Sequence, residues 1–336
     1  MKIAHIFAND RYEPRGFKLV TCLKKSSYDV QELLKFKNEP YWKFVIRCVK
    51  EISCEKPDII HAHRISGFIP AIITKILGLK VKVIYDKHDI HKYDFIFDKL
   101  AALFADYVIV ASDLHKKRMR QICKNVEVIH NYSWFRRSSK EERERIRKEI
   151  GIKKDDVVIL FQGSIVPEYG LHMLLKSVKG LPKKVKILIV GWIKDIKYWN
   201  ECKKEFNGRV IYIGIREYHE MAKYISASDI GVVLFQKCKL AEYGNPNKLF
   251  EFFACKVPVI VTDVLSVSRY VKDGINGFVI KNYIELRDAI KKLISSETRR
   301  NFSKNLPNLR WETEFKKYLK VLNDTYEKKD FKHWLW

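Results

Sequence analysis

The first half of the chain alternates short apolar runs with longer segments that have helical spacing. The short runs are rich in valine and isoleucine, as buried strands are, and they are KIAHIFA, PDIIHAH, VKVIYD, DYVIVAS and VEVIHN. The segments between them, at residues 17–25, at FIPAIITKILG and at residues 95–104, are amphipathic and long enough for helices. Strands that alternate with helices predict a parallel sheet with helices on its faces.

The same alternation restarts after a charged segment at residues 138–156, SSKEERERIRKEIGIKKDD, which has helical spacing but few apolar residues. We interpret this segment as a linker followed by the first helix of a second domain. Further strand-like runs are VVILFQG, KVKILIVG, RVIYIG, DIGVVLF and VPVIVTD. The pattern predicts two doubly wound α/β domains, at residues 1–137 and 138–311. No sequence repeat is visible, so we expect the two domains to share their architecture but not their sequence.

The terminal segment after residue 310 has a helical pattern of its own. Its apolar residues recur at intervals of three and four, at Trp311, Phe315, Leu319, Leu322 and Tyr326. This spacing predicts a long amphipathic helix. The last six residues, FKHWLW, suit either core packing or contact with a membrane surface.

Length and composition describe a globular protein. A chain of 336 residues corresponds to about two domains, and its 47% apolar residues are ample for packed cores. No run of about 18 uninterrupted apolar residues exists, and the start MKIAHIFAND resembles a first strand more than a secretory signal. The seven cysteines form no CxxC motif, so we expect them to be reduced and mostly buried, in a cytoplasmic protein.

The net charge of +25 favours an anionic partner, such as a phosphate-bearing substrate, an anionic lipid or a nucleic acid. The basic residues are spread over both halves instead of forming one patch. The chain lacks both GxGxxG after a first strand and GxxxxGK[ST], which argues against a nicotinamide enzyme and a P-loop ATPase.

The segment at residues 245–263, NPNKLFEFFACKVPVIVTD, places charges within an apolar stretch. Asn245 followed by Pro246 is a strong helix start, because asparagine caps free N–H groups and proline suits the first helical position. We therefore predict a helix from there to about Ala254, followed at once by a strand.

The polar side of this predicted helix has the chemistry of a nucleotide-sugar site. Asn247, Lys248 and Glu251 share that side because they are three or four residues apart. In a parallel α/β sheet, helix N-termini point toward the ligand crevice and favour anions, so Lys248 and free N–H groups would bind phosphate. Glu251 could accept hydrogen bonds from vicinal sugar hydroxyls. The competing interpretation is an exposed Lys–Glu pair worth a few tenths of a kcal/mol.

At this point the residues carry a resemblance to a family. NPNKLFEFFACKVPVIVTD resembles the donor-site segment of the retaining, GT-B type glycosyltransferases of family 4. The other segments that agree, in the right order, are PRGFK (14–18), PDIIHAHR (57–64), VIYDKHD (83–89), DYVIVAS (106–112), VIHN (128–131), ILFQGS (159–164) and SDIGVVL (228–234). The resemblance extends over nearly the whole chain.

The resemblance implies two Rossmann-like domains that face each other across a cleft. The C-terminal domain would hold a nucleotide-diphosphate sugar, and the N-terminal domain would hold a glycan or lipid-linked acceptor. The terminal helix, residues 312–336, would cross back to the N-terminal domain. The activity implied is that of a hexosyltransferase that retains the anomeric configuration.

The resemblance also assigns donor-site residues, with two departures from the family pattern. Glu251 would bind the ribose, but the family's partner glutamate eight residues earlier is Tyr243 here, so the adjacent Glu242 is the candidate for the donor sugar. The loop after the second domain's first strand, GSIVPEYG, lacks the family's two basic residues. We therefore expect Lys248 to stabilise the departing diphosphate.

Three further donor-site candidates complete this set: Gly163, Ser164 and Asn247.

Candidates in the first domain lie at predicted strand ends. The resemblance places His88 near the reacting sugar, next to Asp89 where a glutamate is commoner. The acceptor or phosphate candidates are Arg15, Gly16, His63 and Arg64, whereas His61 and Asn131 are expected to have structural roles.

The chain contains no D-x-D motif, so we expect activity without a metal ion and no other cofactor.

Two alternatives remain open from the sequence. One is a nucleotide-sugar epimerase on the same fold, which would release a free epimer without an acceptor. The other is a non-enzymatic polyanion binder, although no nucleic-acid module is recognisable and we expect no nucleic-acid partner. The basic surface and aromatic tail also predict peripheral contact with anionic lipid at the inner face of the cell membrane.

Overall fold

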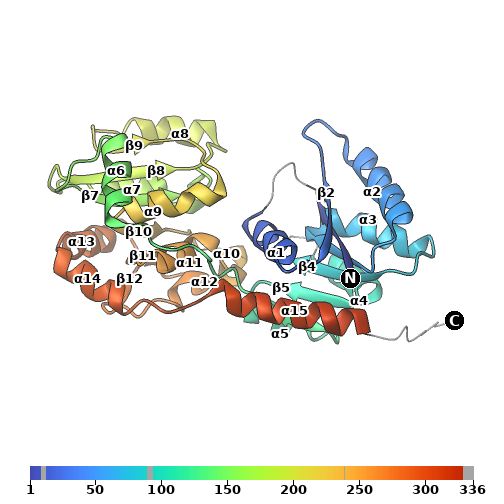
Figure 1. Cartoon of the computed structure of the whole chain (residues 1–336). Helices are drawn as coiled ribbons and strands as arrows, with labels where there is room; N and C mark the ends of the chain where they lie inside the picture. The colour runs from blue at the N-terminus through green and yellow to red at the C-terminus, as the bar shows by residue number, and fades with distance from the viewer. Residues whose placement is uncertain (9–12, 89–93, 238, 328–336) are drawn as a thin grey trace. The chain divides into compact units, whose positions relative to one another are not determined.

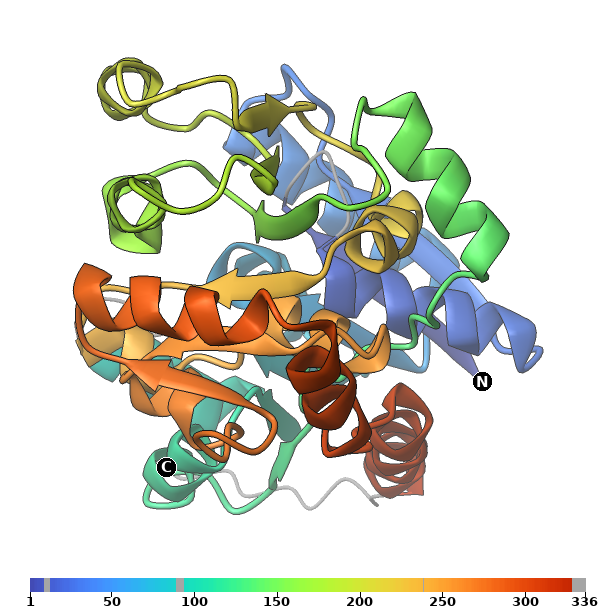
Figure 2. The same ribbon diagram turned by 90° about the vertical axis from the view of Figure 1, so that its left-hand side faces the viewer.

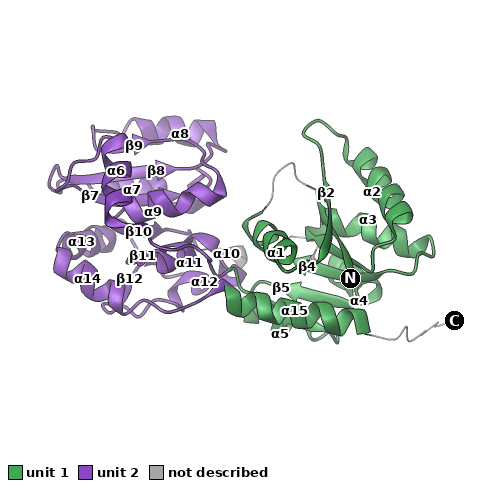
Figure 3. Cartoon of the chain, viewed as in Figure 1, with its two compact units in different colours: residues 1–131, 312–336 green, residues 132–311 purple. Residues whose placement is uncertain are grey.

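The computed structural model describes residues 1–8, 13–88, 94–237 and 239–327. The chain forms two compact units, which are coloured separately in Figure 3. Unit 1 contains Met1–Asn131 and Glu312–Trp336, and unit 2 contains Tyr132–Trp311. Each unit is described by itself below.

Unit 1 contains a six-stranded sheet in which all neighbouring strands are parallel. Its strand order is β2-β1-β3-β4-β5-β6. The strands are β1 (Lys2–Phe7), β2 (Asp29–Leu34), β3 (Ile59–His63), β4 (Lys82–Lys87), β5 (Tyr107–Val110) and β6 (Val126–Val128). The parallel sheet that the sequence predicted is confirmed.

Six helices pack on this sheet (Figure 1). They are α1 (Pro14–Lys25), α2 (Tyr41–Glu55), α3 (Arg64–Ile76), α4 (Asp94–Phe104), α5 (Asp113–Met119) and α15 (Trp311–Glu327). Strand β2 and helix α2 were absent from our sequence interpretation. The edge strand β2 reads DVQELL and buries only Leu33, so it lacks the apolar signal of a central strand.

The two faces of the unit 1 sheet differ in polarity. One face packs apolar residues of α2 and α3, such as Phe44 and Phe68, against Ile60 and Val83 of the sheet. The opposite face carries histidine and aspartate side chains that alternate with the apolar ones along β1, β3 and β4. This polar face is part of the candidate site described below.

The terminal helix α15 packs on unit 1, which confirms that this segment is an amphipathic helix that belongs with the first domain. Tyr318 and Leu322 are fully buried, and the Tyr318 hydroxyl lies 2.7 Å from His61 Nδ1. The buried Glu314 carboxylate accepts a hydrogen bond from the His130 backbone N–H at 2.7 Å. The final FKHWLW segment lies outside the described residues.

Unit 2 contains a second six-stranded sheet, again with parallel neighbours. Its strand order is β12-β11-β10-β7-β8-β9. The strands are β7 (Val157–Gln162), β8 (Val185–Val190), β9 (Val210–Tyr212), β10 (Ile230–Val233), β11 (Val259–Thr262) and β12 (Gly277–Ile280). Two units of this kind confirm the predicted pair of Rossmann-like domains.

Helices cover both faces of the unit 2 sheet, as Figure 2 shows from the side of this unit. Apolar residues of α7, α8 and α13 pack on one face, and those of α6, α9 and α11 pack on the other. The helices of unit 2 are α6 (Lys140–Glu149), α7 (Leu171–Ser177), α8 (Ile196–Lys203), α9 (Met221–Ala227), α10 (Lys239–Tyr243), α11 (Asn247–Ala254), α12 (Leu265–Ser268), α13 (Tyr283–Leu293) and α14 (Ser296–Lys304).

Several helices of unit 2 begin where the sequence offers a capping side chain. The Ser139 hydroxyl accepts from the Glu142 N–H at the start of α6, and the Asn282 side chain accepts from two N–H groups at the start of α13. Each cap satisfies backbone donors that have no partner within the helix. The charged segment at 138–156 therefore does contain the predicted first helix of the second domain.

Two sequence expectations concern the whole chain. The six cysteines within the described residues are free, and Cys48, Cys123, Cys202 and Cys255 are buried. In the part of the chain that the structure describes, no helix has both the length and the apolar character that a membrane span requires.

The contact between α15 and unit 1 yields a stability prediction. Replacing Glu314 with alanine leaves the buried His130 N–H without its acceptor, which costs about 1–3 kcal/mol of unfolding free energy. Urea denaturation followed by circular dichroism measures this change. Glu312→Ala, an exposed carboxylate of the same helix turn, is the matched control and should change the unfolding free energy by less than about 0.5 kcal/mol. Equal effects of the two variants would contradict the assigned docking contact.

Candidate active site

The strand order of unit 2 fixes where a ligand crevice can form. Strand β7 pairs with β8 on one side and with β10 on the other, so the chain reverses its direction of travel across the sheet between β7 and β10. In open α/β sheets, ligands bind at the carboxyl ends of the strands at such a switch point. The loop after β7 and the segment from β10 to α11 meet there.

The loop after β7 approaches its neighbours too closely for side chains. Gly163 has φ +113°, and a Cβ there would lie 3.1 Å from Lys248 Nζ. Gly170 has φ +71°, and a Cβ there would lie 2.4 Å from the Leu234 carbonyl oxygen at the end of β10. Only glycine combines positive φ with this space, so the loop is held against β10 and Lys248 is held against the loop.

Lys248 lies in the first turn of α11, with its ammonium among aromatic rings. Its Nζ is 4.1 Å from the centre of the Tyr169 ring and 5.2 Å from that of Phe235. Burial lowers the pKa of Lys248 to about 8, although the nearby Glu251 carboxylate raises it. The amine is therefore mainly protonated at neutral pH.

Glu251 lies one turn further along α11 and is buried, with 6% of its surface exposed. Its Oε2 accepts a hydrogen bond of 2.9 Å from the Gln162 side-chain amide at the end of β7. Two amide oxygens beside it, Gln162 Oε1 and Asn247 Oδ1, are shielded from solvent and accept no hydrogen bond from any residue that the structure describes. Such oxygens are suited to bind donors on a ligand.

The placement of these side chains corrects two sequence expectations. Helix α11 begins at Asn247 with Pro246 at the N-cap, and the Asn245 side chain donates to the Tyr270 hydroxyl at 3.0 Å instead of capping the helix. Glu251 does not share a solvated face with Lys248, because the end of β7 covers it. The interpretation as an exposed Lys–Glu pair is therefore wrong.

The remaining donor-site candidates have different surroundings. Ser164 lines a hollow of about 670 Å³ together with Tyr169, Lys194 and Asp195, at the same edge of the sheet. Glu242 is exposed on the short helix α10. Its contact with a donor sugar, and the roles of Ser164 and Asn247, stay predictions.

Unit 1 gathers its candidate residues on the polar face of its sheet. The register pairs His5 with His61 and His63 with Asp86, on three adjacent strands. Asp86 is fully buried, and its Oδ1 accepts a hydrogen bond of 2.6 Å from Arg15. Burial alone would raise the pKa of Asp86, but the charges of Arg15 and His88 hold it well below its usual value. The carboxylate is therefore ionised within the protein core.

His88 follows β4 and lies between two carboxylates. Its Nε2 is 3.0 Å from Asp86 Oδ2, and its Nδ1 is 2.8 Å from Glu13 Oε2. Burial lowers the pKa of His88, but the two carboxylates outweigh burial and raise it to about 9. The same contact lowers the pKa of Glu13 to about 2, against the opposing effect of burial. His88 is thus an imidazolium at neutral pH and is not available there as a general base.

The predicted acceptor residues have different surroundings. Arg15 is 1% exposed, and its Nε donates to Asn131 Oδ1 at 2.9 Å. Its guanidinium is thereby held in place for the buried ion pair with Asp86. His63 is also buried and stacks on Phe7. Gly16 lets α1 approach β1, because a Cβ there would lie 2.3 Å from the Phe7 ring. Arg64 is partly exposed and forms an ion pair with Glu13.

Contact of these four residues with an acceptor stays a prediction.

Two groups of these side chains have the spacing of metal ligands, namely His5 with His61 and His63, and His63 with Asp86 and His88. The first group is already paired internally: His5 Nδ1 lies 3.0 Å from His63 Nε2. In the second group Asp86 already forms an ion pair with the guanidinium of Arg15, which opposes a further cation there. Metal-independent activity stays a prediction.

Sequence reasoning missed several of these residues. Glu13 forms an ion pair with His88, and Asp86 forms one with Arg15. Gln162 donates a hydrogen bond to Glu251. In each pair the two residues are far apart in the sequence. The only available signal was position: each lies at or near the end of a predicted strand or the start of a helix. Asp89 lies outside the described residues.

Comparison with protein-family models covers both units. Residues 142–308 match the model described as glycosyl transferases group 1, and residues 5–132 match the model described as glycosyltransferase family 4. The chain belongs to the family 4 glycosyltransferases. This glycosyltransferase is therefore an enzyme that transfers a sugar.

Individual relatives are distant. An uncharacterized glycosyltransferase of Methanocaldococcus jannaschii is 25% identical over 87% of this chain and 80% of its own length. The capsular polysaccharide biosynthesis glycosyltransferase CapM of Staphylococcus aureus is 24% identical over 77% of this glycosyltransferase and 73% of its own length.

Solved structures share the fold. HepE of Anabaena in complex with UDP-glucose superposes with a TM-score of 0.79 at 18% identity, over 96% of this chain and 100% of its own. The catalytic domain of starch synthase IV from Arabidopsis thaliana gives a TM-score of 0.73 at 13% identity, over 98% and 100% of the two chains. The GT-B fold of this glycosyltransferase is thereby confirmed.

The position of His88 yields a prediction about pH. Because its folded pKa of about 9 lies above the unfolded value of about 6.5, the ion pairs stabilise unit 1 fully below pH 6.5. That contribution is lost as the pH rises through 9. Histidine-labelled protein followed by NMR should show one imidazole that titrates near pH 9.

The matched variants make this assignment testable. Glu13→Gln should lower the titration midpoint of that imidazole, because one of its two carboxylates is gone. Glu39→Gln, which removes a carboxylate paired with Arg47 elsewhere in unit 1, should leave the midpoint unchanged. A His88 midpoint between pH 6 and 7 in the unmodified protein would contradict its placement between the carboxylates of Asp86 and Glu13.

Proposed function

We propose that this glycosyltransferase moves a hexose from a nucleotide-diphosphate sugar to a hydroxyl of a glycan or lipid-linked glycan, with retention of anomeric configuration. The observation that carries the proposal is the pair of Lys248 and Glu251 on α11, beside Gly163 at the end of β7. A cation and a carboxylate one helical turn apart at a sheet switch point match the phosphate and ribose ends of a nucleotide.

Lys248 has the properties needed to stabilise a leaving diphosphate. When the bond between the sugar and the diphosphate breaks, negative charge increases on the diphosphate oxygens. A positioned ammonium that is partly shielded by aromatic rings is suited to interact with that charge. The absence of a side chain at Gly163 leaves space beside Nζ for a phosphate oxygen.

Glu251 has the properties needed to bind the ribose. Its carboxylate is ionisable, and Gln162 fixes its orientation through the bond to Oε2. Vicinal hydroxyls can donate to such a carboxylate in a bidentate manner. The acceptor oxygens of Gln162 and Asn247 add further partners for ligand donors.

Relatives support both substrates. HepE is described in complex with UDP, with UDP-glucose and with UDP and glucose, and starch synthase IV is described bound to ADP and acarbose. CapM is named for capsular polysaccharide biosynthesis, and TuaC of Bacillus subtilis is named for teichuronic acid biosynthesis. These names support a nucleotide-sugar donor and a glycan acceptor for this chain.

The proposed chemistry needs no metal ion. Lys248 supplies the positive charge at the diphosphate, and a diphosphate oxygen accepts the proton of the incoming hydroxyl on the face that the diphosphate leaves. Attack on that same face retains the configuration. Glu242 is the proposed contact for the donor sugar, and the His88 imidazolium contributes a positive charge on the acceptor side.

Unit 1 also presents a surface suited to a lipid-linked acceptor. Three large apolar side chains on α2 and the loop before it are largely exposed: Phe36 (62%), Trp42 (60%) and Ile46 (60%). Lysines flank them at positions 35, 37, 43 and 50. Aromatic and aliphatic side chains with flanking lysines favour the interface of an anionic membrane. We therefore propose peripheral contact at the inner face of the cell membrane.

This surface lies beside the edge proposed to hold the acceptor. The Tyr41 hydroxyl at the start of α2 donates to the Ser66 carbonyl at 2.7 Å, near the start of α3. Arg64 begins α3 directly after His63 at the carboxyl end of β3. A lipid-linked acceptor would thus reach Arg64 from a membrane that contacts Trp42.

The donor proposal is tested with nucleotides in the absence of metal. Thermal unfolding against UDP, GDP, ADP, TDP and their sugars should reveal one preferred nucleotide, because a ligand at ~100 times its Kd adds roughly 2.7 kcal/mol of stability. Glu251→Ala should reduce that shift. Lys248→Ala should lower kcat/KM by about 100-fold, consistent with loss of one strong electrostatic contact.

The control for Lys248 is Lys176→Ala, which removes an exposed ammonium 3.9 Å from the Tyr283 ring. Its nucleotide shift and its transfer rate should equal those of the unmodified enzyme. Full transfer activity in Lys248→Ala, or an unchanged nucleotide shift in Glu251→Ala, would overturn the assigned roles.

The membrane proposal is tested with vesicles. Replacing both Trp42 and Ile46 with serine should reduce cosedimentation with phosphatidylglycerol vesicles by at least 5-fold, because their apolar surface no longer enters the interface. Ile76→Ser with Leu77→Ser is the matched control, since these residues are equally exposed, at the opposite end of α3. Nucleotide binding should survive in both variants. Equal losses, or no vesicle binding at low salt, would contradict the proposal.

A further inference from the structure

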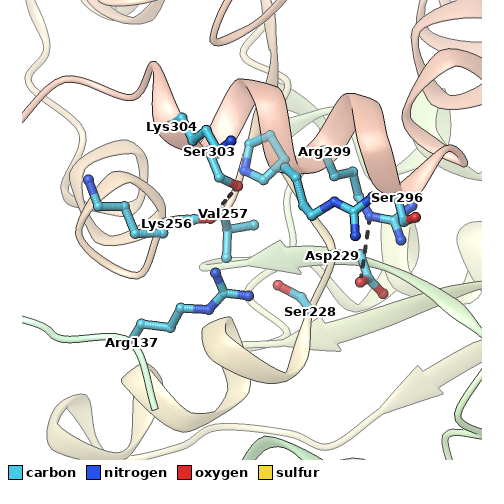
Figure 4. A pocket seen from close by; sticks show the side chains of 11 residues that line it. Arg137, Ser228, Asp229, Lys256, Val257, Ser296, Arg299, Ser303 and Lys304 are labelled. Atoms are coloured by element: carbon cyan, nitrogen blue, oxygen red, sulfur yellow. Dashed lines mark hydrogen bonds and ion pairs between the residues drawn. The ribbon is translucent and has the colours of Figure 1, made fainter. Parts of the chain in front are cut away.

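Unit 2 contains a second hollow, at the amino end of its sheet. Its volume is about 510 Å³, and Figure 4 shows the side chains that line it. Ser228 precedes β10 and Pro258 precedes β11, whereas Gly163 and Lys248 lie at the carboxyl ends of the strands. The four residues of β10 and of β11 separate the two places by roughly 13 Å at ~3.3 Å per residue. The hollow is therefore distinct from the donor site.

The lining of this hollow is strongly basic. Three segments contribute positive side chains to it: the stretch before α6, the turn between α11 and β11, and helix α14. The five positive residues are Arg137, Lys256, Arg299, Arg300 and Lys304. Asp229 is the one carboxylate in the lining. In Figure 4 the Arg137 guanidinium extends toward Val257, below α14.

The single carboxylate does not neutralise these charges. Asp229 Oδ1 lies 2.8 Å from Arg143, its Oδ2 lies 3.1 Å from Arg147, and Arg299 Nε lies 3.7 Å from Oδ1. The Val158 backbone N–H also donates to Oδ2. Asp229 is thus fully engaged, with three guanidinium groups around one carboxylate.

In the part of the chain that the structure describes, the other positive residues have no acidic partner. Within the described residues, no carboxylate forms an ion pair with Arg137, Lys256, Arg300 or Lys304. Most exposed lysines in solution are equally unpaired, so this fact alone assigns no site. Here, however, the charges come from three separate segments and surround a hollow of ligand size, and a bound anion would relieve their mutual repulsion.

The backbone at Lys256 adds an independent observation. Lys256 has φ +59°, in the left-handed region after α11, where glycine or asparagine is usual. A lysine in this conformation is strained relative to glycine, because its Cβ crowds the following carbonyl oxygen. Ser303 of α14 donates to the Lys256 carbonyl at 2.9 Å, so this strained residue is tied to the helix that carries Arg300 and Lys304.

We propose that this hollow binds a phosphate-bearing anion, with Arg137, Lys256 and Lys304 as its principal contacts. A guanidinium offers paired N–H donors to phosphate oxygens, and two ammonium groups supply the charge that a pyrophosphate or phosphomonoester needs. The ligand is either a soluble phosphate compound or the headgroup of an anionic lipid. The site does not depend on the donor site, because the two lie at opposite ends of the sheet.

The first arm of the test uses inorganic pyrophosphate and isothermal titration calorimetry. Lys248→Ala is the background, so that pyrophosphate bound at the donor site does not contribute. The combined substitution Arg137→Gln, Lys256→Asn and Lys304→Gln should weaken pyrophosphate binding at least 10-fold. Asparagine is chosen at position 256 because it tolerates the left-handed conformation.

The second arm uses vesicles of phosphatidylglycerol in phosphatidylcholine. If the natural ligand is a lipid headgroup, the same triple variant should lose vesicle binding at least 10-fold, with Trp42 and Ile46 intact. If the ligand is soluble, vesicle binding should be unchanged while pyrophosphate binding is lost. Either result supports the proposed site and shows whether its ligand is a lipid headgroup or a soluble phosphate compound.

The matched control removes the same number of charges elsewhere on unit 2. Lys183→Gln, Lys197→Gln and Lys203→Gln are exposed positions outside the hollow. Binding should change less than 2-fold in this control. Equal losses in the two triple variants, or no loss in either arm, would overturn the proposal. Lys304→Gln alone, at the exposed end of α14, provides a folded single variant that should still lose part of the affinity.

Discussion

A buried carboxylate organises the first unit of this enzyme. Asp86 has no exposed surface, and an ionised carboxylate in such a place is tolerated only when positive charge and hydrogen bonds compensate for its lost hydration. Arg15 supplies one compensation and His88 supplies the other. Arg15 is in turn fixed by Asn131, and His88 by Glu13, which also holds Arg64. The edge of the sheet proposed to meet the acceptor is therefore arranged around one charge in the core.

The second unit solves a related problem with aromatic rings in place of counter-charges. Lys248 lies against Tyr169 and Phe235, and the Glu251 carboxylate, which also acts on its pKa, accepts a hydrogen bond from Gln162. Burial lowers the pKa of this amine more than the Glu251 carboxylate raises it. One unit thus neutralises its buried charges internally, whereas the other surrounds a partly buried ammonium with aromatic rings.

Much of this arrangement could be predicted from the sequence, and the exceptions have physical causes. The apolar runs located nearly all central strands, because parallel strands are buried on both faces, and strand-end logic located Gly163, Lys248 and Glu251 at one edge. The edge strand β2 escaped because only Leu33 is buried in it. The pairs Glu13 with His88 and Gln162 with Glu251 escaped because side-chain contacts between distant elements leave no periodic signal. Asn245 was misjudged as a cap because its amide has a competing partner in Tyr270.

The last helix of the chain completes the first unit, and this has a consequence for synthesis on the ribosome. His61 cannot form its contact with Tyr318 until that residue, 257 positions later in the chain, has been synthesised. At ~5–20 residues per second, that delay is roughly 13 to 51 s. The whole of unit 2 emerges during this interval, while the polar face of the first sheet still lacks α15. The domain that is made first therefore receives its last helix only after unit 2 has been synthesised, and until then α15 does not cover its histidine-rich face.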